Sequence, residues 1–199
     1  KLSDKIYYSI TAGKEELSLN NHLGLILKDE TLGLNPKLIN SKTGKVNEVL
    51  KPVVPLKFST VPNVYNYLIL HFKGGYSVEF RAFDEGIAYR FITAKKGTME
   101  VVDEDFSVHF STDDLLYLQE AASFKSNQEE PYSKSVVKDW SISGKMATLP
   151  LLIDAKKQYK ILISESDLSD YPCMFLKANG KSMKAVFPKV PTEFGPDGD

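Results

Sequence analysis

Three features of the amino-acid sequence predict an all-β fold, either a sandwich or a barrel of short strands. Aromatic residues make up 11% of the 199 residues, with ten Tyr and eleven Phe. The twelve Gly and ten Pro residues are scattered along the chain and divide it into short segments. Many of these segments alternate between apolar and other side chains with a period of two, which is typical of β-strands.

The clearest pattern lies in the middle of the chain. Residues 64–72 alternate with a period of two, and both sets of side chains are rather apolar, which predicts a strand buried between two layers. The two glycines at 74–75 then predict a turn. Residues 76–91 alternate on both sides of an Asp-Glu-Gly turn signal at 84–86, which predicts a β-hairpin.

The same reasoning predicts the remaining elements. The dipeptide Asn179-Gly180, between two β-rich runs, is a strong hairpin signal. Residues 113–122 are predicted to be a helix capped by Thr112, because three leucines fall on one side. We predict further strands at residues 6–10, 23–28, 99–102, 106–110, 147–153, 159–164, 174–178 and 182–187, turns at 20–21, 41–44, 95–97 and 143–144, and a long polar loop at 123–138.

Composition excludes several classes of protein. Lys and Arg number 25 against 26 Asp and Glu, a net charge of −1, which argues against nucleic acid as the main partner. The single cysteine, Cys173, cannot form an internal disulfide, and its apolar neighbours predict a buried, inert thiol. No apolar run reaches the ~18 residues that span a bilayer, and neither an amphipathic basic helix nor a lipidation signal appears, so no membrane association is expected. We expect one sandwich domain over residues 1–187 and a tail or linker over 188–199.

Few residues point to chemistry by themselves. The sequence contains no phosphate-binding glycine loop, no zinc-protease helix motif and no nucleophile elbow. The three histidines, which lie far apart in the sequence, are interpreted as surface or partly buried side chains. Asp103 to Asp105 are interpreted as solvated loop charges. Trp140 and the tyrosines are either platforms for sugar rings or core residues, and the core is the commoner fate of aromatic side chains.

One acidic segment is more informative. Glu165 directly follows a predicted buried strand, and Glu165, Asp167 and Asp170 fall within six positions. Hard cations such as calcium bind carboxylate oxygens on loops. The segment lacks the regular calcium-loop pattern, so by itself it is only a weak indication of a metal site.

The order of several stretches resembles a known family. They are residues 78–91, which read Val-Glu-Phe-Arg-Ala-Phe-Asp-Glu-Gly-Ile-Ala-Tyr-Arg-Phe, residues 148–153 running on to 161–176, and more loosely residues 63–68. In this order they resemble the N-terminal domain of glycoside hydrolase family 97. The resemblance covers nearly the whole chain.

That resemblance implies a β-supersandwich similar to galactose mutarotase, with an open edge at its C-terminal end because related domains run longer. It implies a catalytic (β/α)8 barrel in the same polypeptide, which cleaves α-linked oligosaccharides as an α-glucosidase or α-galactosidase. It also implies a calcium ion near the active site, held partly by a glutamate from the N-terminal domain. Glu165 matches that glutamate. Family members are commonly exported, so a periplasmic or secreted location is expected.

The third stretch departs from the family pattern. Val64 and Tyr67 stand where family members tend to carry His and Glu. Only Asn63 and Asn66 are therefore kept as candidates near the interface or the substrate side. Two other functions stay open at this point: a stand-alone carbohydrate-binding sandwich that uses Trp140, and a mutarotase-like epimerase that uses a His and a Glu.

Overall fold

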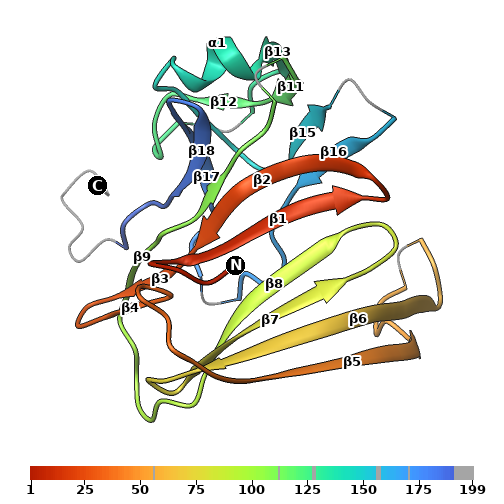
Figure 1. Cartoon of the computed structure of the whole chain (residues 1–199). Coiled ribbons are helices and arrows are strands. Elements are labelled where there is room, and N and C mark those ends of the chain that lie inside the picture. Colours follow the sequence, from red (N-terminus) through yellow and green to blue (C-terminus); the bar gives the residue numbers. More distant parts are fainter. Residues whose placement is uncertain (56, 112, 127–128, 156–157, 170, 191–199) are drawn as a thin grey trace. The chain divides into compact units, whose positions relative to one another are not determined.

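Figure 1 shows the computed structural model, which describes residues 1–190 except 56, 112, 127–128, 156–157 and 170. The contacts divide the chain into two compact units. Unit 1 comprises Lys1–Leu34 and Val101–Asp199, and unit 2 comprises Asn35–Glu100. Antiparallel sheets make up both units, which confirms the predicted all-β class.

Unit 2 is a four-stranded antiparallel meander. Its strands are β5 (Leu38–Leu50), β6 (Val61–Phe72), β7 (Tyr76–Ala82) and β8 (Ile87–Thr93). The predicted hairpin at 76–91 is confirmed as β7 and β8, and the strand at 64–72 is confirmed as part of β6. Gly74 and Gly75 form the β6–β7 turn with φ values of 95° and 74°, which only glycine adopts readily.

Two predictions in unit 2 are wrong. Residues 41–44 form no turn, because they lie inside β5 and pair with β6. Gly44 serves the sheet instead, since a Cβ atom there would lie 2.7 Å from Cε1 of Tyr67, whose ring covers the glycine. The strand at 64–72 is not buried on both faces, because within it only Tyr65 and Phe72 are buried and Val64 is 40% exposed.

Unit 1 contains a seven-stranded sheet in the order β1-β2-β10-β18-β17-β14-β12. The hairpin at Asn179-Gly180 is confirmed, with Gly180 at φ 66°. The turn predicted at 20–21 is instead a bulge in β2, where Asn20 has a φ of 55° and the pairing with β1 shifts register. The strands are β1 (Ile6–Ala12), β2 (Glu15–Leu23), β10 (Ser107–Val108), β18 (Ser182–Val186), β17 (Phe175–Asn179), β14 (Met146–Ala147) and β12 (Glu120–Ala121).

Two smaller sheets complete unit 1. One has the order β13-β11-β15-β16, with β13 (Ser133–Val136), β11 (Leu115–Leu118), β15 (Leu151–Asp154) and β16 (Lys160–Ile163). The other has the order β4-β3-β9, with β4 (Thr31–Leu32), β3 (Leu25–Leu27) and β9 (Val101–Glu104). In the described part of the chain the one α-helix is the short α1 (Val137–Ser141).

The helix predicted at 113–122 is wrong. Leu115–Leu118 form β11, which pairs with β13 on one side and β15 on the other. Its burial alternates, with Leu116 and Leu118 fully buried, so strand pairing overrides the helix propensity of the leucines. The predicted cap, Thr112, lies outside the described residues. The loop predicted at 123–138 also contains β13 and the start of α1.

The burial of two side chains in unit 1 can now be compared with the predictions. Trp140 in α1 is 2% exposed, so it is a core residue. Cys173 is exposed in the irregular segment before β17, so the prediction of a buried thiol is wrong. No helix among the described residues is long and apolar enough to cross a bilayer. The largest fully buried side chains of unit 1 are Trp140, Ile6, Leu23, Leu32, Leu116, Leu118, Leu151, Ile153, Leu176 and Met183.

The predicted boundary at 187 and the linker role of 188–199 stay predictions. Residues 188–190 have no regular structure, and the rest of that segment lies outside the described residues.

Candidate metal-ligand site

Glu165 lies in unit 1, in the chain between the end of β16 and the start of β17. Its side chain is half-buried, and Oε2 accepts a hydrogen bond of 2.8 Å from the backbone N–H of Met174. Met174 is itself buried and immediately precedes β17. The carboxylate therefore ties the end of one strand to the beginning of another, which limits the directions in which it can point.

A second carboxylate lies close to this connection. Glu104 ends β9 and is half-buried, and its Oε1 accepts a hydrogen bond of 2.7 Å from Oη of Tyr171. The Tyr171 ring also packs edge-on against Phe187, with 5.8 Å between ring centroids. Tyr171 thereby holds the segment after Glu165 against β9 and against the end of β18.

The two glutamates lie in an unfavourable electrostatic environment. Burial raises the pKa of Glu165, and the Met174 N–H opposes that shift only in part. Burial also raises the pKa of Glu104, the Tyr171 hydroxyl opposes it, and the charges of Glu165 and Asp103 raise it further. Among the described residues, no Lys, Arg or His forms an ion pair with either glutamate. Ionisation of this pair would be favoured by a cation from elsewhere.

Glu165 fits a hard cation as one ligand among several. Its Oε1 accepts no hydrogen bond from the described residues, so this oxygen is available to a metal. Calcium takes six to eight oxygen ligands. The described part of the chain holds no group of three His, Cys, Asp or Glu side chains that could bind a metal, so most ligands would have to come from outside it. Asp167 is exposed in the same segment, and Asp170 lies outside the described residues.

Comparison with known proteins gives this chain a family. The family model described as "Glycosyl-hydrolase 97 N-terminal" matches residues 1–193. The chain belongs to this family. A retaining alpha-galactosidase of Bacteroides thetaiotaomicron is 30% identical over 209 residues, which cover 98% of this chain and 31% of that protein.

Solved structures support the fold of this glycoside hydrolase 97 N-terminal domain. A family 97 enzyme from Pseudoalteromonas sp. strain K8, in complex with acarbose, superposes with a TM-score of 0.80 at 21% identity, over 92% of this chain and 29% of that one. A beta-arabinopyranosidase superposes with a TM-score of 0.81 at 24% identity, over 94% of this chain and 32% of that one. The chain thus has the predicted sandwich fold and spans about a third of the length of these relatives.

The neighbouring Asp105 of the family 97 domain differs from Glu104. It contacts Lys5 Nζ at 2.7 Å and His22 Nε2 at 2.9 Å. Burial opposes its ionisation, but Lys5 and His22 outweigh burial, so the pKa of Asp105 is lowered. The interpretation of residues 103–105 as solvated loop charges is therefore wrong for Glu104 and Asp105, because both are partly buried and have specific partners.

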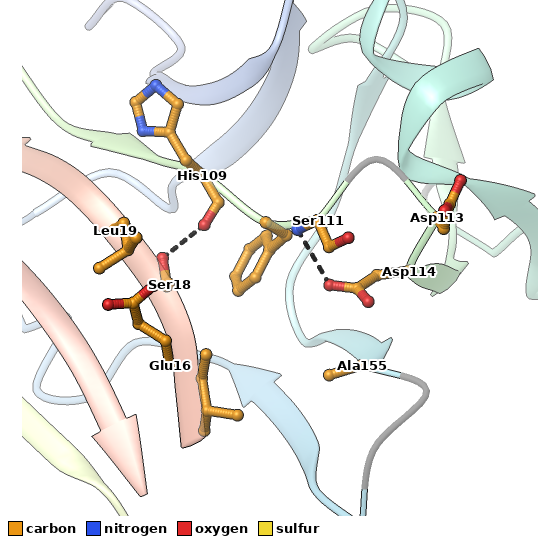
Figure 2. Close-up of a pocket in the computed structure, with 10 residues that line it drawn as sticks. Glu16, Ser18, Leu19, His109, Ser111, Asp113, Asp114 and Ala155 are labelled. Carbon is orange, nitrogen blue, oxygen red and sulfur yellow. Dashed lines mark hydrogen bonds between the residues drawn. The ribbon is translucent and has the colours of Figure 1, made fainter. Parts of the chain in front are cut away.

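A hollow of about 470 Å³ opens elsewhere in unit 1 (Figure 2). His109 lines it with its carbonyl, which accepts a hydrogen bond from the Ser18 hydroxyl, while its imidazole turns away (Figure 2). The backbone N–H of Ser111 donates to Oδ2 of the buried Asp114 at 3.1 Å (Figure 2). These polar groups form two separate hydrogen-bonded pairs, Ser18 with His109 and Ser111 with Asp114. The residues that line the hollow do not include His22, the histidine that contacts a carboxylate.

The other candidate residues each lie within one of the two units. Trp140 belongs to unit 1, but its burial leaves no ring face for a sugar, which corrects the stacking hypothesis. Asn63 and Asn66 lie on β6 in unit 2, and their separation of three positions places them on opposite faces of the sheet. Nδ2 of Asn63 donates to Oε1 of Glu48 at 2.6 Å, and Asn66 is exposed.

Sequence reasoning found Glu165 but missed Glu104 and Tyr171. Glu104 was one of three consecutive acids, and such a run is more often solvated. Tyr171 lies in the stretch that resembles the family, yet nothing in the sequence indicates that its hydroxyl meets a residue 67 positions earlier. The contact between Glu104 and Tyr171 arises from long-range packing, so neither residue could be recognised from its local sequence.

Proposed function

We propose that this chain is the non-catalytic N-terminal sandwich domain of a calcium-dependent α-glycosidase, and that Glu165 supplies one ligand to the calcium ion. The observation that carries the proposal is the geometry of Glu165. One carboxylate oxygen is anchored by the Met174 N–H at 2.8 Å, and the same carboxylate has a raised pKa because burial opposes its ionisation. A carboxylate held in this way is preorganised for a cation brought by another domain.

Hydrolysis itself is assigned to the remainder of a longer polypeptide. Glycosidases generally need two carboxylates on opposite sides of the scissile bond. We expect both to lie in a (β/α)8 barrel, since relatives of this chain are about three times as long. The likeness to a retaining alpha-galactosidase makes α-galactosides the first substrates to test, followed by α-glucosides. We expect the parent enzyme to be periplasmic or secreted.

Within this chain, Glu165 and the residues that position it would contribute to calcium binding. Glu165 would bind the ion through Oε1 while Met174 holds Oε2. Calcium, when bound, would supply Lewis acidity and a fixed positive charge near the substrate. The strands β16 and β17 set the position of Glu165, and the remaining ligands come from the partner domain.

The decisive experiment uses the full-length enzyme, stripped of metal with a chelator. Calcium binding is measured by titration calorimetry for the wild type, Glu165→Gln and the control Glu129→Gln, which changes an exposed loop glutamate. We expect Glu165→Gln to weaken calcium binding about 10-fold or more, because it removes a charged ligand, and the control to leave it unchanged. Equal affinities for wild type and Glu165→Gln would refute the ligand assignment.

A second arm tests the parent activity. The full-length enzyme is assayed on α-galactosides and α-glucosides, with calcium and after chelation. We expect hydrolysis of one class and loss of rate after chelation. If neither is cleaved, and the 199-residue chain alone binds oligosaccharides, the stand-alone sugar-binding function replaces the present proposal.

A further inference from the structure

The segment that follows Glu165 returns to it. Eight residues separate Glu165 from Met174, and the Glu165 carboxylate closes this loop on the Met174 N–H at 2.8 Å. Within the loop most side chains are exposed, and Asp167 has a φ of 62°. Met174 is itself buried beside β17, but the exposed loop that leads to it from Glu165 has little packing of its own to fix its path.

Tyr171 is the described residue of the loop that reaches back into the fold by its side chain. Its hydroxyl donates to Glu104 at 2.7 Å, and its ring packs edge-on against Phe187. Glu104 lies in β9, which pairs with β3, so the anchor is a paired strand rather than another loop. Tyr171 lies three residues before Met174, so it anchors the exposed loop between Glu165 and that N–H.

We propose that Tyr171, through its hydrogen bond to Glu104, is a positioning residue that holds Glu165 in the orientation in which it binds calcium. The inference rests on the proposed function of Glu165. A glutamate side chain has three rotatable bonds, all of which must be restrained before its carboxylate points in one direction. The Met174 N–H restrains the Glu165 carboxylate, Tyr171 restrains the loop that connects Glu165 to Met174, and Glu104 restrains Tyr171.

The test replaces Tyr171 by Phe in the full-length, metal-stripped enzyme. This change keeps the ring contact with Phe187 and removes only the hydroxyl. We expect calcium affinity to fall about 10-fold, because outer partners of metal ligands usually contribute 10- to 100-fold. Tyr7→Phe is the matched control, since it removes another tyrosine–carboxylate hydrogen bond, from Tyr7 to Asp4, at an exposed position.

Two further readouts separate positioning from a merely structural role. The luminescence decay of terbium bound in place of calcium should become faster in water for Tyr171→Phe, because a displaced Glu165 admits water to the ion. In a Glu104→Met background, Tyr171→Phe should lower calcium affinity no further, as expected for residues that act through one contact. Circular dichroism establishes that each variant is folded at the temperature of the titration.

The outcomes are distinguishable. If Glu165→Gln weakens calcium binding but Tyr171→Phe binds calcium like the wild type, this inference fails and the proposed function stands. An equal loss from Tyr171→Phe in both backgrounds would show that Tyr171 does not act through Glu104, and would also overturn it. If Glu165→Gln binds calcium as tightly as the wild type, the proposed role of Glu165 is refuted, and so is the role of Tyr171 that depends on it.

Discussion

Glu104 and Asp105 are consecutive in the chain and have opposite electrostatic surroundings. Asp105 contacts two basic side chains, Lys5 and His22, and its pKa is lowered despite partial burial. Glu104 contacts only a neutral hydroxyl among the described residues, and the charge of nearby Glu165 adds to the effect of burial in raising its pKa. At the end of β9, one position along the chain thus separates a carboxylate with basic partners, Asp105, from one without them among the described residues, Glu104.

Unit 2 contains a second neutralised carboxylate. Glu79 is 5% exposed and contacts Arg81 at 2.9 Å and Arg90 at 2.6 Å. Burial opposes its ionisation, but the two arginines outweigh burial and lower the pKa of Glu79. Asp105 and Glu79 thus both have basic side chains beside them. The absence of such a partner at Glu104 and Glu165, within the described residues, is what distinguishes the candidate metal-ligand site.

The largest effect is expected from removing the buried carboxylate of unit 2. Glu79→Ala should lower the free energy of unfolding of the 199-residue chain by about 2 kcal/mol, because it removes charge-assisted hydrogen bonds to Arg81 and Arg90, and such bonds contribute about 1.5 to 3 kcal/mol. Urea denaturation followed by circular dichroism measures the change. Glu79→Gln, which keeps one of the two acceptor oxygens, should have a smaller effect. A loss below about 0.5 kcal/mol for Glu79→Ala would mean that Arg81 and Arg90 are satisfied by water alone.

Asp105→Asn should lower the free energy of unfolding by about 1 kcal/mol at pH 7, which is typical of a partly exposed ion pair. Because the pKa of Asp105 is lowered on folding, its contribution is present above the unfolded value of about 3.9 and is lost as the pH falls through the folded pKa. Wild type and variant should therefore differ at pH 7 and converge in strong acid. A difference that stays constant down to about pH 2 would show that the charge of Asp105 is not the cause.

Glu104→Gln should not lower the free energy of unfolding at pH 7, in contrast to Asp105→Asn. Because the pKa of Glu104 is raised on folding, ionisation opposes folding increasingly as the pH rises from about 4.3 through the folded pKa. With a chelator present, the variant should be at least as stable as the wild type at pH 7, by up to about 1 kcal/mol. The two should be equal below about pH 4. Thermal unfolding of both proteins is measured at pH 7 and below pH 4. A variant that is clearly less stable than the wild type at pH 7 would show that Glu104 and Asp105 do not differ in the way described.

The smallest effect is expected at an exposed pair that serves as a baseline. Lys145 Nζ and Glu120 Oε2 are 2.7 Å apart, and the Lys145 side chain is 56% exposed. Lys145→Met should change the free energy of unfolding by about 0.5 kcal/mol or less, since solvent screens such pairs. A change as large as that of Asp105→Asn would show that distance alone, and not burial, sets the strength of these pairs.

Local sequence was sufficient wherever neighbouring residues form the structure together. The hairpins at 76–91 and at Asn179-Gly180 are confirmed, because their strands and turns lie within a few residues of each other. The same local logic failed at 113–122, where leucines spaced for a helix are held in β11 by two distant strands. It failed again at 41–44, since Gly44 sits inside a strand to admit the Tyr67 ring.

Short-range periodicity and residue identity were enough to predict the all-β class, most of the strands, the family resemblance and the candidacy of Glu165. Long-range packing, which the local sequence does not display, buries Trp140, gives Asp105 its basic partners and brings Tyr171 to Glu104. The physical reason is that burial and charge compensation arise between segments far apart in the chain, so that two adjacent acids, Glu104 and Asp105, acquire opposite electrostatic character from neighbours that the local sequence does not name.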